Sequence, residues 1–338
     1  MMFRVAQIPI ALVLLISLSG CPRQTAELRP TLAGLDEGAF GFESHETLHW
    51  DNILKARFEG VGKTVAEAEI ILPEASEGSV PAVVLMHGSG GRGKREKRYA
   101  AELIDEGFAV VILDSFGPRG IRTTGGRQEQ VSTATMLGDV FAVLDLLDSH
   151  PKIDGSRVAI VGFSKGGSVA MLSADEKIRR GLLQTDRRFA AHVAFYPGCV
   201  IKLKEVEPTG SPLLVLLGGS DSYTPAEQCE RFMSRMRAAD YPVRSITYPG
   251  AHHAWDGDYQ VRKSNFDYSY GNCEAEIDAA GRTLDGKTGE VVDARSKSAV
   301  RKWIRGCGVP GVWIGLNQAA KDKSLADMKA FLRKTLLK

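Results

Sequence analysis

Short runs of residues that are apolar at nearly every position recur along the chain and alternate with segments of helical periodicity. The runs occupy residues 81–87, 109–114, 157–163, 192–198 and 212–219. A strand that is apolar throughout is buried on both faces of its sheet, and strands that alternate with helices indicate parallel pairing. The pattern predicts an α/β domain, with a mostly parallel central sheet and helices on both faces.

The segments with apolar residues at helical spacing are predicted as helices, and three further segments as strands. Gly107 and Pro151 end the first two helices, because these residues commonly terminate helices. The expected helices are 100–108, 133–151, 226–239 and 324–337, and the additional strands are 53–60, 66–73 and 243–250.

Two stretches depart from this alternation. Residues 21–45 show no clear periodicity, and we expect them to be a tether that precedes a domain at 46–338. Residues at about 258–320 contain turns and two cysteines and are predicted to be an insertion before the last helix. The sequence does not decide whether this insertion is a lid, a surface loop held by a disulfide, or an interaction patch.

The N-terminus has an apolar run from Val5 to Leu18 after a single arginine, which is typical of a secretory signal peptide. The run ends in Leu-Ser-Gly-Cys, which resembles the bacterial lipoprotein cleavage box. This resemblance implies that residues 1–20 are removed and that Cys21 carries lipid and anchors the chain to a membrane. Pro22 stands where an inner-membrane retention signal would have Asp, so we expect a lipid-anchored protein of the periplasmic side, in the outer membrane if the cell is Gram-negative.

Composition adds limits on the function. The chain has 338 residues, 43% of them hydrophobic, which suffices for one large domain, and its formal net charge of +2 gives no reason to expect nucleic acid as a partner. If Cys21 carries lipid, four cysteines remain. An even number of cysteines in an exported chain suggests disulfides, and four cysteines allow three pairings. No C-x-x-C spacing indicates a metal site. Besides Cys21, the cysteines are Cys199, Cys229, Cys273 and Cys307.

A G-x-S-x-G pattern at 162–166 follows a predicted strand and precedes a helix-like stretch. In this context the pattern indicates a nucleophile elbow, whose tight turn exposes Ser164 at the end of the sheet. A serine hydroxyl needs a base that takes its proton and an acid that orients that base.

Candidates for the base and the acid follow Ser164 in the expected order. Asp221 comes directly after one strand, and His252 and His253 follow the next. Spacing does not decide between the two histidines. Asp256 and Asp258 are rival acids that we assign to a surface loop.

Two backbone N–H groups should stabilise the oxyanion. The Lys165 amide follows the nucleophile, and the second amide should come from the loop after residues 81–87, where we choose Ser89. His87 precedes the nucleophile and is interpreted as a residue that shapes this loop. The same loop matches P-loop spacing, but Arg95 replaces the magnesium-binding Ser or Thr, which argues against nucleotide binding.

Arg119 and Arg122 lie in the loop after residues 109–114, on the side of the predicted site. A guanidinium there could bind a substrate carboxylate. A role in bracing the loop through backbone contacts is an equally good reading.

The motifs together resemble the dienelactone hydrolase family of α/β-hydrolases, from about residue 48 to the end apart from the insertion. The resemblance rests on "MHGSGG", "LDSFGPRG", "GFSKGG", "LLGGSDSYTP" and "YPGAHHAWD". It implies the α/β-hydrolase fold and no cofactor. It also implies that His253 is the base, because the family has Ala or Gly and then an aromatic residue after its histidine.

One departure changes the expected substrate. The enzymes that give the family its name have a Cys in the elbow, where this chain has Ser164. The resemblance therefore implies a hydrolase of carboxylic esters or lactones that forms an acyl-enzyme, with a non-catalytic binding module or a peptidase of the same fold as alternatives. In such a fold Cys199 and Cys229 could lie close enough to pair, which would leave Cys273 to pair with Cys307.

Overall fold

A computed structural model describes residues 26–74 and 78–337. The predicted signal peptide and Cys21 lie outside the described residues. Within those residues, no helix has both the length and the apolar character needed to cross a lipid bilayer.

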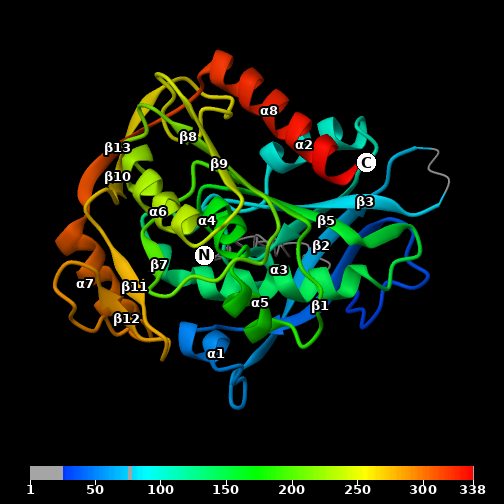
Figure 1. Cartoon of the computed structure of the whole chain (residues 1–338), viewed down its shortest axis with the longest axis horizontal. Coiled ribbons are helices and arrows are strands. Elements are labelled where there is room, and N and C mark those ends of the chain that lie inside the picture. Colours follow the sequence, from blue (N-terminus) through cyan, green and yellow to red (C-terminus); the bar gives the residue numbers. More distant parts are fainter. Residues whose placement is uncertain (1–25, 75–77, 338) are drawn as a thin grey trace, which may run out of the picture.

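An eight-stranded sheet forms the centre of the molecule, with the strand order β1-β2-β4-β3-β5-β6-β8-β9 (Figure 1). The first three neighbours, β1, β2 and β4, pair antiparallel, and the other pairs are parallel. The strands are β1 Gly38–His45, β2 Lys63–Ile71, β3 Val80–Met86, β4 Ala109–Asp114, β5 Ile153–Phe163, β6 Ala191–Phe195, β8 Leu213–Gly218 and β9 Val243–Tyr248.

Helices cover both faces of this sheet because successive side chains of each inner strand point to opposite sides. Val84 and Ile160 pack on one face with α3, α4, α5 and α6, whereas Leu85 and Val161 pack on the other with α2 and α8. The predicted fold class is therefore confirmed. The helices are α1 Trp50–Leu54, α2 Lys94–Ile104, α3 Thr133–Leu147, α4 Lys165–Leu172, α5 Glu176–Leu182, α6 Ala226–Ala238, α7 Lys297–Cys307 and α8 Gln318–Leu336, with short 3-10 turns η1 Gly117–Arg119 and η2 Gln128–Gln130.

The N-terminal part of the domain differs from the prediction in two places. The expected tether at 21–45 is wrong for its last part, because β1 pairs with β2 along its whole length and Phe40 and Phe42 are buried. Residues 53–60, expected as a strand, instead contain the end of the short helix α1, in which Trp50 and Ile53 are buried. Contacts with other segments, β2 for β1 and α5 for α1, which only the tertiary structure supplies, decided both segments.

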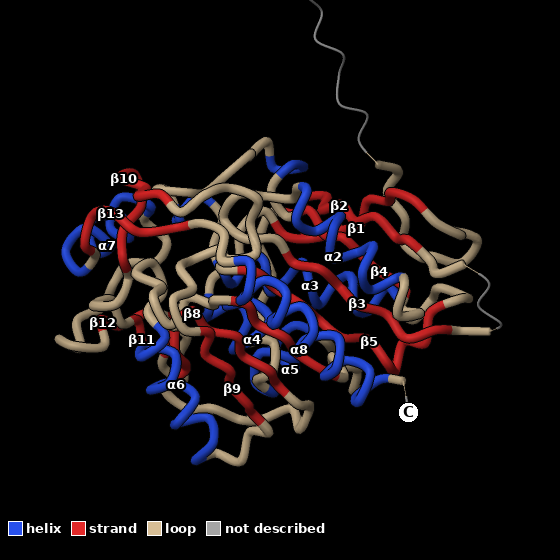
Figure 2. Tube along the Cα trace, turned by 90° about the horizontal axis from the view of Figure 1, so that it is seen from above, coloured by secondary structure: helices blue, strands red, loops and turns tan. Residues whose placement is uncertain are grey.

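The insertion has its own small elements at one end of the molecule (Figure 2). One antiparallel pair joins β10 and β13, and a three-stranded sheet joins β12, β11 and β7, the last of which comes from the main domain. These strands are β7 Ile201–Leu203, β10 Arg262–Ser269, β11 Ala275–Ile277, β12 Thr283–Asp285 and β13 Val309–Ile314.

Two disulfides join the four cysteines in the pairing that the resemblance implied. The Cys199–Cys229 bond links the loop after β6 to helix α6. The Cys273–Cys307 bond joins the segment before β11 to the last residue of α7, across a sequence separation of 34 residues. The second bond therefore closes most of the insertion into a loop.

Candidate active site

The turn between β5 and α4 holds Ser164 in a strained conformation. Its φ is 54° and its ψ is −114°, a backbone region that side-chain-bearing residues seldom adopt. The turn is tight enough that a Cβ on Gly162 would lie 1.9 Å from the carbonyl oxygen of Gly166, and one on Gly166 would lie 2.3 Å from that of Met86. The glycines of the motif are thus required for the close approach of strand and helix.

The three predicted triad residues lie in one hydrogen-bonded row at the carboxyl ends of β5, β8 and β9. His253 Nε2 lies 2.8 Å from Ser164 Oγ, and His253 Nδ1 lies 2.8 Å from Asp221 Oδ2. Asp221 and His253 are both buried, whereas Ser164 is partly exposed. An Nδ1–H that donates to Asp221 leaves Nε2 free to accept the serine proton, which is the tautomer that a general base needs.

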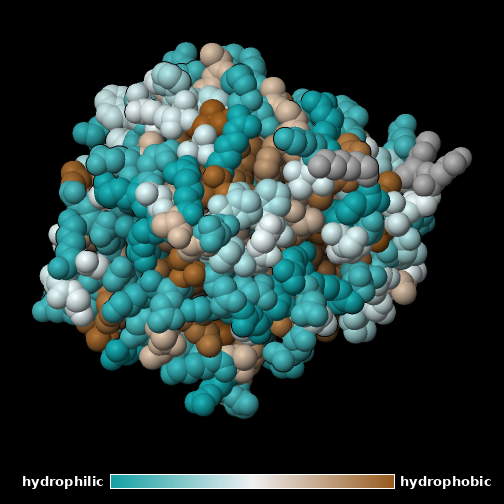
Figure 3. Space-filling view, in the orientation of Figure 1, coloured by the Kyte–Doolittle hydropathy of each residue, from teal (hydrophilic) through white to brown (hydrophobic). Residues whose placement is uncertain are grey.

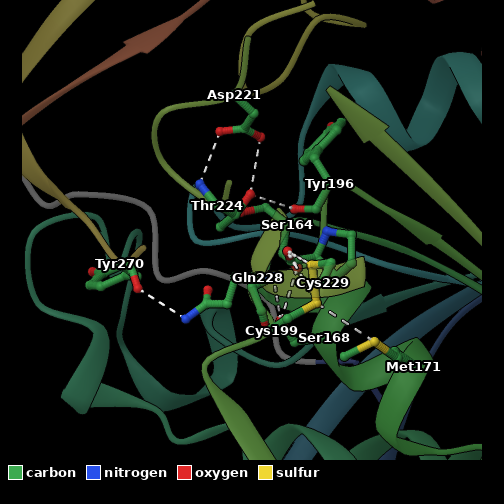
Figure 4. Close-up of a disulfide and its surroundings, with 12 residues drawn as sticks. Ser164, Ser168, Met171, Tyr196, Cys199, Asp221, Thr224, Gln228, Cys229 and Tyr270 are labelled. Carbon is green, nitrogen blue, oxygen red and sulfur yellow. Dashed lines mark hydrogen bonds between the residues drawn. A yellow bond between two sulfur atoms is a disulfide. The ribbon is translucent and has the colours of Figure 1, made fainter. Parts of the chain in front are cut away.

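Asp221 is held by the turn that follows it (Figure 4). Its Oδ1 accepts hydrogen bonds from the amides of Tyr223 at 2.8 Å and Thr224 at 2.9 Å. The Thr224 hydroxyl donates to Asp221 Oδ2 at 3.0 Å and lies 3.1 Å from His253 Nδ1. Thr224 was missed in the sequence, although an Asp that begins a turn commonly accepts from amides two and three residues later.

Two tyrosine rings enclose the imidazole of His253. The ring centroid of Tyr196 lies 4.8 Å away in an edge-on arrangement, and that of Tyr223 lies 4.6 Å away. These rings restrict the imidazole to the orientation that reaches both Ser164 and Asp221. Sequence reasoning did not identify either tyrosine.

The rival acids and the rival histidine have other partners. Asp256 was assigned to the surface, which is wrong: it is fully buried, and it accepts hydrogen bonds from Tyr196 Oη at 2.7 Å and Arg95 Nε at 3.1 Å. Asp258 is exposed and pairs with Arg98. His252 Nδ1 lies 2.9 Å from the carbonyl oxygen of Ser220, so its ring points away from Ser164.

Of the two amides predicted for the oxyanion, that of Lys165 follows Ser164 directly in the chain, and that of Ser89 follows Gly88, whose position lies close to Ser164. Lys165 is the first residue of α4, where a helix leaves its amides without intrahelical partners. Within residues 26–74 and 78–337 we find no hydrogen bond donated by the amides of Lys165 or Ser89. Ser89 is fixed through its hydroxyl, which donates to Gln128 Oε1 at 3.0 Å, and through its carbonyl, which accepts from the Thr124 amide.

His87 connects the loops that follow β3 and β4. Its Nε2 accepts from the Ser115 amide at 3.1 Å, and its Nδ1 lies 2.8 Å from the Gly88 carbonyl oxygen. Burial lowers the pKa of this imidazole, which favours the neutral form that such bonding requires. The structure thus agrees with a role in shaping the loop.

The glycine-rich loop after β3 approaches the nucleophile closely. A Cβ on Gly88 would lie 2.9 Å from the Phe163 carbonyl oxygen and 3.2 Å from Ser164 Cβ. The side chain of Arg95 turns toward Asp256 in the neighbouring loop. Glycine at position 88 therefore allows the loop after β3 to lie close to the turn at Ser164.

The Lys165 side chain is buried and connects α4 to η2 and to the residue directly after it. Its Nζ donates to the backbone carbonyls of Gln128, at 2.8 Å, and Val131. Burial lowers the pKa of this ammonium to about 7, and the nearby Glu129 opposes that shift.

Arg119 does not face the site, which corrects its assignment to substrate binding. Its guanidinium makes two hydrogen bonds of 2.9 Å to the fully buried Asp139 of α3 and also donates to the carbonyls of Ser115 and His45. A buried carboxylate requires such a partner, and it draws the guanidinium inward. Arg122 is exposed. The bracing role is therefore correct for Arg119.

A cavity of about 210 Å³ opens from Ser164 toward the insertion. Polar residues that line it include Ser89, Ser164, Lys165, Glu129 and Lys297, and many of the other lining residues are apolar. The apolar lining residues include Leu48, Trp50 of α1, Ile201 of β7, and Ala275, Ile277, Val292, Val300, Trp303 and Ile304 of the insertion. We call this cavity the apolar chamber. Among the described residues, no cluster of His, Cys, Asp or Glu is arranged to hold a metal ion.

The parallel sheet, the serine elbow and the order of the site residues define an α/β-hydrolase. The family model described as "Dienelactone hydrolase family" matches residues 67–285, which is more than half of the chain, and the chain therefore belongs to this family. The match includes Ser164, Asp221 and His253.

Curated relatives are distant. An uncharacterized protein of Mycobacterium tuberculosis is 28% identical over 193 residues, which cover 54% of this chain and 66% of the relative. A Bradyrhizobium protein described as "Probable 2-oxo-3-(5-oxofuran-2-ylidene)propanoate lactonase" is 26% identical over 190 residues, or 53% of this chain and 74% of that protein. The chain thus spans just under two thirds of the length of the first of these relatives.

Solved structures support the fold. A metagenomic dienelactone hydrolase-like promiscuous phosphotriesterase, P91, aligns with a TM-score of 0.51 at 18% identity and covers 88% of this chain and 99% of its own. The structure described as "m3DLH" aligns with a TM-score of 0.52 at 16% identity over the same shares of the two chains. At these identities the likeness concerns the fold alone.

Proposed function

We propose that this protein is a serine hydrolase that cleaves a carboxylic ester or lactone through an acyl-enzyme intermediate. The observation that carries the proposal is the continuous row from Ser164 Oγ through the His253 ring to Asp221 Oδ2, with both contacts at 2.8 Å. Within residues 26–74 and 78–337, the amides of Lys165 and Ser89 donate no hydrogen bond to the protein, and this supports the proposal.

In the acylation step, His253 Nε2 takes the proton of Ser164 as the serine oxygen attacks the substrate carbonyl carbon. The amides of Ser89 and Lys165 donate hydrogen bonds to the oxygen that becomes negative. Asp221 accepts from His253 Nδ1–H and stabilises the imidazolium. The imidazolium then gives its proton to the leaving alcohol oxygen, the ester C–O bond breaks, and the acyl group stays on Ser164.

Deacylation repeats these steps with water as the nucleophile. His253 takes a proton from water, the hydroxide attacks the acyl carbonyl, and the proton returns to Ser164 as the acid departs. For a lactone the alcohol and the acid are parts of one product molecule. The printed name of the Bradyrhizobium relative is that of a lactonase, which supports a lactone as a second test substrate.

We also propose that the mature protein begins at Cys21, carries lipid there and faces the periplasm, as the sequence predicts. Globomycin treatment of cells that express the full chain should cause accumulation of an unprocessed form that is larger by the signal peptide. A chain of unchanged size, or a mature protein without a lipid mass on Cys21, would contradict the anchor.

The test of the catalytic proposal is hydrolysis of p-nitrophenyl acetate. Ser164→Ala should lower kcat/KM by at least about 10³-fold, since triad members supply most of the rate. A fluorophosphonate should add its phosphonyl mass to the peptide that contains Ser164. Absence of both turnover and labelling, in protein that is folded by circular dichroism, would favour a binding module, and turnover confined to peptide anilides would favour a peptidase.

A further inference from the structure

The apolar chamber has walls to which the proposed chemistry gives no role. On the face shown in Figure 3, hydrophobic residues appear only in small patches among hydrophilic ones. The chamber, in contrast, joins apolar side chains from the main domain and the insertion beside Ser164. Ligand cavities in proteins commonly combine such apolar walls with a few polar groups at the reactive end.

Helix α7 presents an apolar face to the chamber. Val300, Trp303 and Ile304 are spaced three and four residues apart, so they lie on one side of the helix. All three line the chamber, yet no residue of α7 is fully buried. An apolar helix face that packs against a cavity remains incompletely covered until the cavity is filled.

Two other lining residues, one from the insertion and one from the main domain, are well buried. Ile277 of β11 is 1% exposed and Trp50 of α1 is 5% exposed, and both line the chamber. Two of the charged residues that line it have other partners: Lys165 donates to two carbonyls, and Glu129 Oε1 lies 3.3 Å from Arg301 Nε. Lys297, the first residue of α7, also lines the chamber and is exposed to solvent. The buried apolar residues therefore offer contacts to an apolar group of a substrate.

The position of His253 indicates which part of an ester would enter the apolar chamber. The leaving alcohol must lie beside His253 Nε2, because it takes its proton from there. Ser164, Lys165 and Ser89 line the chamber. The acyl group stays bonded to Ser164 Oγ after the alcohol has left, so a chamber that opens from Ser164 would hold the acyl group through both steps.

We propose that the insertion forms an acyl-binding chamber, so that esters of apolar acids of medium chain length are preferred over acetate esters. This rests on the proposed serine-hydrolase function. Helix α7 is the wall that sets the length of acyl chain that fits. The attachments of this wall include the Cys273–Cys307 bond, the hydrogen bond from Trp303 Nε1 to Asp285 Oδ2 at 2.6 Å, and the ion pair between Arg301 and Glu129.

The first test is a series of p-nitrophenyl esters from acetate to dodecanoate. The kcat/KM of the wild type should rise about two- to four-fold for each added methylene until the chamber is full, because each buried methylene contributes favourably. Val300→Trp, which fills the chamber, should lower the ratio of octanoate to acetate kcat/KM at least ten-fold. Lys302→Trp is the matched control, since Lys302 is exposed on the same helix, and should leave this ratio within two-fold.

The second test measures binding without catalysis. Calorimetric titration of the Ser164→Ala protein should show that octanoate binds at least ten-fold more tightly than acetate and that adding Val300→Trp removes the difference. Ester turnover with a flat chain-length profile and equal binding of both acids would overturn the chamber proposal and leave the serine hydrolase intact. Octanoate binding that depends on Val300, without any ester turnover, would instead overturn the catalytic proposal.

Discussion

The central sheet and the insertion are built on different principles. The sheet has an apolar cluster on each face, and its strands β5, β8 and β9 end at the residues of the triad row. The insertion has a separate antiparallel pair of strands, a helix without a fully buried residue, and a disulfide that closes most of it. The comparison teaches that the sheet determines the geometry of Ser164, His253 and Asp221, whereas the insertion shapes the space next to them.

The largest expected effect comes from breaking the triad row on the sheet. His253→Ala removes the group that lies 2.8 Å from both Ser164 Oγ and Asp221 Oδ2. We expect kcat/KM for p-nitrophenyl acetate to fall by about 10³- to 10⁴-fold. His252→Ala is the neighbouring control and should retain activity within a few-fold; the reverse result would reassign the base by one residue.

The next effect concerns the packing of the elbow. In Gly162→Ala the new Cβ would lie 1.9 Å from the Gly166 carbonyl oxygen, so strand and helix must move apart. We expect the free energy of unfolding to fall by about 3 kcal/mol or more, as for other severe overpacking. Gly90→Ala, with no atom within 4 Å of the added Cβ, is the control for denaturant unfolding. Equal stability of the two variants would mean that the elbow is looser than described.

A third prediction tests whether the insertion can unfold locally while the central sheet stays folded. Replacing both Cys273 and Cys307 by Ala opens a loop with a sequence separation of 34 residues. In the chain-entropy model such a bond contributes about 3 to 4 kcal/mol. Hydrogen exchange of α7 and β12 should increase while that of β5 and β6 stays unchanged. Equal acceleration in both regions would show that the insertion and the sheet unfold as one unit.

The smallest effect is a pH dependence centred on Lys165. Burial lowers the pKa of this side chain in the folded protein to about 7, from the ordinary lysine value of 10.5. Between these values the unfolded chain binds the extra proton, so this group makes stability rise with pH. In Lys165→Met, the free energy of unfolding should rise less steeply with pH between pH 7 and 9, by about 1 kcal/mol per pH unit. An unchanged slope in urea titrations would show that the ammonium stays charged in the fold.

The sequence predicted the inner strands and the elbow because these are local patterns. Apolar runs at 81–87, 109–114, 157–163, 192–198 and 212–219 all lie in strands of the sheet or reach the turns directly after them. The strained φ of Ser164 follows from a glycine motif within five residues. Asp221 and His253 could be named because parallel strands bring their ends to one edge.

The rest depended on contacts between segments far apart in the chain. Arg119 faces Asp139 and not the cavity, Asp256 is buried beneath Tyr196 and Arg95, and β1 completes the sheet where a tether was expected. Charge alone does not say whether an arginine or an aspartate has a buried partner, because that partner can come from any element. Local periodicity and motif spacing thus determined the scaffold and the candidate nucleophile Ser164, and only the tertiary structure decided which polar groups meet and how the insertion lines the apolar chamber.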